Sequence, residues 1–227
     1  MKTLRKNDID SMERELQVLE NPEGILGGTF YYNKDDGKLL GQVGSGAEVR
    51  VITADMFIDC QNYGDEAAGS LFTASESKAK EAILRNMFPS GVEFRNVVED
   101  NCNTGMLAGV KHFGHEDDSG NIIVDGADFK FNGSDPLWNN FYNMKSSVTH
   151  ESFHYSHPVL ESAPIEDKGA YENRAVYTQL NDPTYNNTTE DYKQGIANDL
   201  YRAWNQMGIA DKDGKFTQDD ACRKCGL

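Results

Sequence analysis

The sequence predicts an α+β fold, in which a strand-rich N-terminal half precedes a helical C-terminal half. Two observations lead to this prediction. Segments of alternating apolar and polar residues, bounded by glycine-containing turns, lie in the N-terminal half. From Pro136 onward the pattern becomes helical, and cap and stop residues separate its segments. We therefore expect a main domain over residues 27–210, preceded by an N-terminal helical lead (1–26) and followed by a C-terminal tail (211–227).

The N-terminal half is expected to begin with a helix and a hairpin. Apolar residues at helical spacing predict the helix over 8–20. Thr29–Tyr32 and Lys38–Val43 flank Asp35-Asp36-Gly37, a hairpin signal because glycine readily adopts the positive φ of a tight turn. The segments that follow are a third strand (48–53), a loop (59–73), a helix (75–88), a strand (92–98), and two strands or a hairpin (121–124 and 127–131).

The C-terminal half is expected to hold three helices. The first spans 138–156 and stops at His157-Pro158, because proline disfavours the helical conformation of the residue before it. The second covers about 167–180. The third starts at the polar run Thr188–Asp191, which supplies cap residues, and ends near Gly208.

The charge of the chain excludes some classes of partner. Acidic residues outnumber basic residues by 37 to 22, so the formal net charge is −15. Such a surface repels phosphates and anionic lipid headgroups, and we expect neither nucleic acid nor a membrane as partner. No apolar run is long enough to span a bilayer, and no signal peptide follows the basic start Met1–Lys6. We expect a soluble protein that is cytosolic, already processed, or exported by another route.

One motif inside the first C-terminal helix carries recognisable chemistry. Residues His150 to His154 read His-Glu-Ser-Phe-His, which places two imidazoles one turn apart on one helix face, within reach of one tetrahedral zinc ion. Glu151 lies roughly 100° round the helix from His150, near the metal but outside the ligand set. Zinc makes water more acidic, and the glutamate would take its proton as the water attacks a carbonyl. The motif therefore predicts a Zn²⁺-dependent hydrolase with Glu151 as general base.

A catalytic zinc ion usually has a third protein ligand. Glu172 is the best candidate, because it lies on the next predicted helix, 18 residues after His154. The alternatives that stay open are Glu161, Glu166 and Asp167. The metzincin pattern is excluded, since Leu160 stands where its third histidine would be and His157 where it needs glycine.

The motif from His150 to His154, followed by Tyr171-Glu172-Asn173-Arg174-Ala175, resembles the zincins of gluzincin type over about residues 138–181. This resemblance implies a zincin-like fold, the zinc ligands His150, His154 and Glu172, and Glu151 as general base. The segment Tyr31–Gly41 is also similar to segments that lead into metallopeptidase toxin domains of bacterial secreted effectors. That second resemblance implies delivery by a secretion system, and it leaves room for an inhibitor or immunity protein as partner.

The expected reaction is hydrolysis of amide bonds in a peptide or protein substrate. Residues 128–131 are expected to present a strand edge to an extended substrate. Two alternatives stay open, namely a zinc amidase acting on cell-wall peptides and a non-catalytic binding module with an accidental or inactive motif. The candidates for an oxyanion donor, none of which is assigned, are His157, Tyr171, Arg174, Tyr177 and Tyr185.

The cysteines predict no further metal site. Cys222 and Cys225 form a Cys-x-x-Cys pair at the C-terminus, but Cys60 and Cys102 are too far apart to supply the second pair of a zinc ribbon. We expect disulfides or idle thiols.

Two other polar clusters have equally plain interpretations. The segment 211–217 resembles part of a calcium loop, but Ile209 at its first ligand position cannot coordinate, so we expect a polar turn. His112 and His115 are expected to be surface loop histidines rather than a second metal site.

Overall fold

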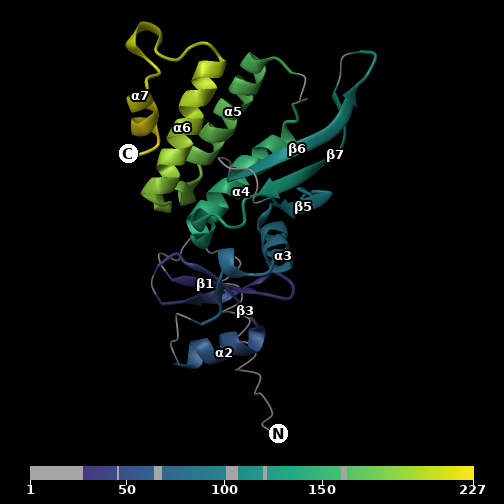
Figure 1. The fold of residues 1–227 in the computed structure, drawn as a ribbon, viewed down its shortest axis with the longest axis vertical. Helices are drawn as coiled ribbons and strands as arrows, with labels where there is room; N and C mark the ends of the chain where they lie inside the picture. Colours follow the sequence, from purple (N-terminus) through teal and green to yellow (C-terminus); the bar gives the residue numbers. More distant parts are fainter. Residues whose placement is uncertain (1–27, 45, 64–67, 101–106, 120–121, 160–162) are drawn as a thin grey trace.

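The computed structural model describes residues 28–227, apart from 45, 64–67, 101–106, 120–121 and 160–162. The helix predicted over 8–20, the N-terminal lead, Cys102 and Glu161 therefore lie outside the described residues. Within them, two small sheets belong to the strand-rich N-terminal half and helices dominate the C-terminal half, which confirms the α+β prediction. Figure 1 shows the first sheet and α2 at one end of the molecule, with α5, α6 and α7 at the other.

The described residues form two small sheets, with two helices among their strands and four helices after them. The first sheet contains β1 (Thr29–Asn33), β2 (Leu39–Val43), β3 (Val49–Ile52) and β4 (Ser70–Leu71). The second contains β5 (Asn96–Glu99), β6 (Ala108–Glu116) and β7 (Ile122–Phe131). The helices are α2 (Ala54–Tyr63), α3 (Ser77–Met87), α4 (Phe141–Ser156), α5 (Ile165–Leu180), α6 (Glu190–Gln206) and α7 (Gln218–Lys224). Short 3₁₀ turns are η2 (Phe72–Ala74), η3 (Pro136–Asn139), η4 (Pro183–Asn187) and η5 (Lys212–Gly214).

The first sheet contains the predicted hairpin. Strands β1 and β2 pair antiparallel, and β3 lies parallel to β1 on its other side. Gly37 in the turn has a φ of 71°, and a Cβ atom there would lie 2.2 Å from the backbone carbon of Ala82 on α3. The hairpin turn therefore packs directly on α3, and only glycine fits at this position.

Stacked aromatic rings join the first sheet to the start of α4. The rings of Phe30 and Phe141 are stacked, with centroids 3.8 Å apart and an angle of 7° between their planes. Asn140 is extended (φ −112°, ψ 125°), and its side-chain oxygen accepts hydrogen bonds from the backbone N–H groups of Tyr142 and Asn143. Because the extended backbone of Asn140 interrupts the helical conformation, α4 begins at Phe141. The prediction of one helix from residue 138 is wrong for 138–140.

The second sheet has the order β5-β7-β6, so β7 is its central strand and β6 lies at an edge. The prediction that residues 128–131 present an edge is therefore wrong. Strand β7 is also one continuous strand across Gly126, instead of two, because β6 pairs with it along its length. The sequence did not predict β6, because its glycines and charged residues have a low preference for strands. Pairing with β7 stabilises this strand instead.

Two further predictions need correction in the N-terminal half. The loop predicted over 59–73 is wrong for 59–63, because α2 continues to Tyr63, and for 70–71, which form β4 and pair with β3. The start of α2 is held by the Thr53 hydroxyl and by packing of Phe57 on Tyr31. The strand predicted over 92–98 is shorter and runs from Asn96 to Glu99, the four residues that pair with β7.

The C-terminal segment ends in a helix that packs on α6. Helix α7 starts with a capping box between Thr217 and Asp220, and it buries Ala221 and Cys225 completely. Cys222 and Cys225 are both free, as expected of idle thiols, and burial raises the pKa of Cys225 to about 11. Across the described residues, no helix has the length and apolar character that crossing a membrane requires.

Candidate metal centre

Helix α4 carries the His-Glu-Ser-Phe-His motif and is anchored in the core ahead of it. Its first half buries Phe141, Met144 and Val148 among the aromatic residues between the two sheets. The motif follows on the same helix, so His150 and Glu151 are buried and His154 is half-buried. The helix ends after Ser156, as the following His157-Pro158 predicts.

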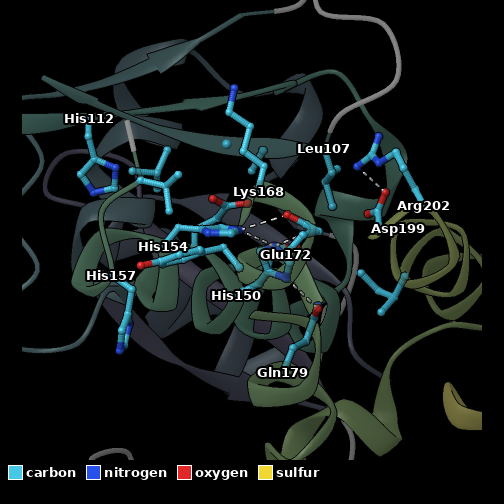
Figure 2. A pocket seen from close by; sticks show the side chains of 18 of the residues that line it. Leu107, His112, His150, His154, His157, Lys168, Glu172, Gln179, Asp199 and Arg202 are labelled. Atoms are coloured by element: carbon cyan, nitrogen blue, oxygen red, sulfur yellow. Dashed lines mark hydrogen bonds and ion pairs between the residues drawn. The ribbon is translucent and has the colours of Figure 1, made fainter. Parts of the chain in front are cut away.

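Helix α5 packs on α4 and brings Glu172 to the two histidines (Figure 2). The Nε2 atoms of His150 and His154 are 3.0 Å apart. The carboxylate oxygens of Glu172 lie 3.4 Å from Nε2 of His150 and 3.3 Å from Nε2 of His154. The structure thus brings together three of the residues that the sequence singled out, each through an atom able to bind a metal.

The spacing of these atoms fits a tetrahedral metal ion. Nitrogen and oxygen ligands lie about 2.0–2.1 Å from zinc, so two ligands of a tetrahedral site are separated by roughly 3.3 Å. The two imidazole nitrogens are 3.0 Å apart, and each lies 3.3–3.4 Å from a different carboxylate oxygen of Glu172. These separations are close to those between ligand atoms of one ion, which is compatible with a metal site.

The alternative acidic ligands lie elsewhere. Glu166 and Asp167 are exposed in the first turn of α5, and neither lines the cavity that contains the cluster. Glu161 lies outside the described residues. Among the described acidic candidates, Glu172 alone contacts the histidines.

His150 and Glu172 shift one another's pKa values. Burial disfavours a charged His150, but the hydrogen bond and negative charge of Glu172 outweigh it and raise the pKa of His150 to about 9. Burial likewise disfavours a charged Glu172, but hydrogen bonds and charges of both histidines hold its pKa well below the usual range. The arrangement therefore favours a carboxylate facing positive charge, which is the charge that a cation would supply.

Glu151 differs from Glu172 in that its carboxylate is not neutralised by a close partner. Its side chain lines the same cavity, only 5% of the residue is exposed, and its Oε2 atom has no hydrogen-bond partner among the described residues. Burial raises the pKa of Glu151, although the nearby histidines oppose the shift. A buried carboxylate oxygen without a partner is unusual in a folded protein, and its place beside a cavity marks Glu151 as a functional candidate.

The cavity has a volume of about 280 Å³, and β6, α4, α5 and α6 form its walls. The first residues of β6 and the residue before them, Leu107–Val110, line one side, and Asp199 and Arg202 of α6 line another. Sequence reasoning missed both walls. The β6 segment has no clear strand pattern, and an ion pair such as Asp199–Arg202 (2.8 Å) is common on helix surfaces.

The candidate oxyanion donors separate into two groups. His157 and Tyr171 line the cavity, so they stay candidates. Arg174, Tyr177 and Tyr185 do not line it, and the hydroxyl of Tyr185 donates a hydrogen bond to the carbonyl of Cys225.

His112 and His115 lie on strand β6 and not in a loop, which corrects that prediction. His112 lines the cavity, and its Nε2 atom is 3.3 Å from the carbonyl oxygen of Tyr155. His115 is exposed, with its ring 3.8 Å from Asp125. In the described part of the chain, neither belongs to a second cluster of metal-binding groups.

An α+β fold with a His/His/Glu cluster in a cavity is compatible with a metal-dependent enzyme. Residues 116–220 match the family described as metallopeptidase toxin 2, a span that contains the cluster and covers just under half of the chain. The match supports a metallopeptidase toxin domain here, as the resemblance predicted, and a metallopeptidase implies a divalent metal. Comparison with curated proteins and with solved structures gives no significant match.

Proposed function

We propose that this chain is a zinc metallopeptidase that hydrolyses peptide bonds, with Glu151 as general base. The observation that supports this most is the cluster of His150, His154 and Glu172, whose ligand atoms lie close together beside a buried, unpartnered glutamate oxygen. The match to a metallopeptidase toxin family supports the same class of reaction.

The roles follow from the positions of these side chains. His150, His154 and Glu172 would hold the zinc ion, which supplies Lewis acidity toward a carbonyl and toward water when bound. Glu151, which lines the cavity, would accept a proton from the attacking water at its carboxylate and donate it to the leaving amine. Its raised pKa suits this exchange, because a stronger base takes a proton from water more readily.

The substrate in this proposal is an extended peptide segment. Strand β6 is an edge strand, and its first residues line the cavity with the cluster. A peptide that adds to this edge would place a main-chain carbonyl near the histidines. The expected strand edge is therefore retained, but it moves from residues 128–131 to the start of β6.

The biological setting in this proposal is that of a toxin delivered by a secretion system, and the matched family, described as metallopeptidase toxin 2, supports the toxin part of it. A toxin of this kind needs a protein inhibitor in the cell that makes it, so we propose an immunity protein as a partner. The net charge of −15 supports a protein partner over nucleic acid or an anionic membrane.

The first test is the zinc content of the purified protein, measured by mass spectrometry after reconstitution. We expect about one zinc ion per chain, loss of zinc in Glu172→Gln, and retention in Glu166→Gln, which changes an exposed glutamate on the same helix. A wild-type protein without zinc would refute the proposal and favour the binding module. Zinc retained in Glu172→Gln would refute the ligand set.

Activity on a panel of unfolded proteins and peptidoglycan fragments then separates the two enzymes that the site allows. Cleavage of proteins, lost in Glu151→Gln, is the expected result. Cleavage of cell-wall peptides alone would replace the peptidase by the amidase.

A further inference from the structure

Helix α5 carries a second polar side chain directed at the cluster. Gln179 lies two turns after Glu172 on the same face of α5, and it is fully buried. Figure 2 shows it on the far side of His150 from Glu172. A buried amide is retained only where its donors and acceptor are satisfied, so its partners indicate its role.

Both amide hydrogens and the amide oxygen of Gln179 are engaged in hydrogen bonds. Its nitrogen lies 2.9 Å from the hydroxyl of Ser146 and 2.7 Å from the hydroxyl of Tyr192. Its oxygen lies 3.1 Å from Nδ1 of His150. The amide nitrogen has two hydrogens and no free lone pair, so each hydroxyl accepts one hydrogen. The amide oxygen can only accept, and Nδ1 of His150 must therefore carry a proton.

This hydrogen bond determines which nitrogen of His150 can bind a metal. A neutral imidazole has one protonated nitrogen and one with a free lone pair. With the proton on Nδ1, the lone pair is on Nε2, the atom that faces His154 and Glu172. We infer that Gln179 is a positioning residue for His150, which fixes both the orientation of the ring and the tautomer that presents Nε2 to the metal.

Two neighbouring helices hold Gln179 in this position. The hydroxyl of Tyr192 on α6 accepts from Gln179 and is also hydrogen-bonded, at 2.7 Å, to the hydroxyl of Ser147 on α4. A continuous chain of hydrogen bonds therefore links His150 through Gln179 and Tyr192 back to α4. All five residues are buried, the most exposed at 8%, so water does not compete for these bonds.

His154 lacks this support. Among the described residues, its Nδ1 atom has no hydrogen-bond partner, and its side chain is more exposed than that of His150. The two motif histidines are therefore unequal, and Gln179 acts on only one of them.

The test measures zinc affinity by competition with a chelator, and it rests on the proposed function. Gln179→Met removes the acceptor and is expected to weaken zinc binding roughly 10- to 100-fold, as loss of such partners does. Gln179→Glu keeps an oxygen toward His150, while both hydroxyls can donate to the carboxylate, so affinity should stay within about threefold of wild type. Val176→Ala is the control, since it removes buried apolar volume one turn earlier on α5 without touching the polar network.

The outcomes separate this inference from the proposed function. A wild-type protein that binds no zinc refutes the proposed function. A wild type that binds zinc while Gln179→Met binds it equally well refutes the role of Gln179. Equal weakening in Gln179→Met and Val176→Ala also refutes it, because stability alone would then explain the loss.

Nitrogen-15 NMR of the zinc-bound wild type decides the tautomer even if Gln179→Met does not fold. We expect a protonated Nδ1 on His150, hydrogen-bonded to an amide oxygen. A His150 ring with an unprotonated Nδ1 would overturn the inference, since the amide of Gln179 would then be turned the other way.

Discussion

Replacing Glu151 by glutamine is expected to make the metal-free protein more stable while it abolishes turnover. Glu151 is 5% exposed as a residue, and its buried Oε2 atom has no hydrogen-bond partner among the described residues. Leaving such a group buried costs roughly 1–3 kcal/mol. The neutral amide avoids part of that cost, because burial penalises charge more than polarity.

The size of the effect is set by two opposing contributions. Burial raises the pKa of Glu151, whereas the positive charges of His150 and His154 lower it, and burial is the larger. We therefore expect the free energy of unfolding of Glu151→Gln to exceed that of wild type by about 1 kcal/mol, near the low end of the range. This difference raises Tm by roughly 2–4 °C in a protein of this size.

The pH dependence supplies the sign of the effect. A carboxyl whose pKa is raised on folding stabilises the folded state at low pH, where it is protonated, and loses that contribution as pH rises through the folded pKa. The advantage of Glu151→Gln should therefore be present at pH 7 and should shrink on acidification toward the ordinary pKa of a glutamate.

Thermal unfolding with excess chelator measures this difference at several pH values. Glu93→Gln is the control, since Glu93 is exposed and lies outside the helices and strands. A Glu151→Gln protein that is less stable than wild type at pH 7, or whose advantage does not change with pH, would refute the reasoning. Turnover should fall about 10²- to 10⁴-fold in the zinc-bound variant, as for loss of a general base.

Three further predictions concern the frame that supports the site, and chemical denaturation measures each. Gly37→Ala should lower the free energy of unfolding by more than about 2 kcal/mol, because it adds a clash with α3 to the backbone strain. Its control Gly91→Ala, which has only the strain, should lower it by about 1 kcal/mol. Equal losses in the two variants would contradict the clash. Asn140→Ala should cost about 0.5–2 kcal/mol through loss of the α4 cap, and no loss would show that the cap is dispensable. Lys80→Met should lower the free energy of unfolding by roughly 3–5 kcal/mol, because it removes the ammonium group that lies 2.7 Å from the Glu99 carboxylate. Adding Glu99→Leu to this variant should recover most of the lost stability.

Local sequence signals predicted the features that depend on neighbouring residues. The hairpin around Gly37 and the helix that carries the motif follow from turn chemistry and apolar spacing, and both are present. Glu172 was predicted beside the histidines because a helix–loop–helix return brings it back at that distance along the chain, and the structure places it there. The boundary at Asn140 was missed, since residues on both sides of this cap have helical patterns.

Features that depend on pairing between distant segments were not predicted. Strand β6 has a weak strand pattern of its own and is stabilised by β7, so neither the edge strand nor its place in the cavity wall could be read from the chain. The role of Gln179 requires Tyr192 on another helix, and no spacing in the sequence indicates that pair.

The sequence by itself therefore determined the chemistry available to this protein, and the tertiary structure decided how that chemistry is arranged. His154 and Glu151 lie four residues and one residue after His150 on one helix. The pitch of the helix fixes their directions relative to His150, so the spacing in the sequence is enough to predict them. The proposed third ligand Glu172, the edge strand and the partner of His150 come from other elements. Their positions follow from packing between surfaces far apart in the chain, and local propensity carries no information about that packing.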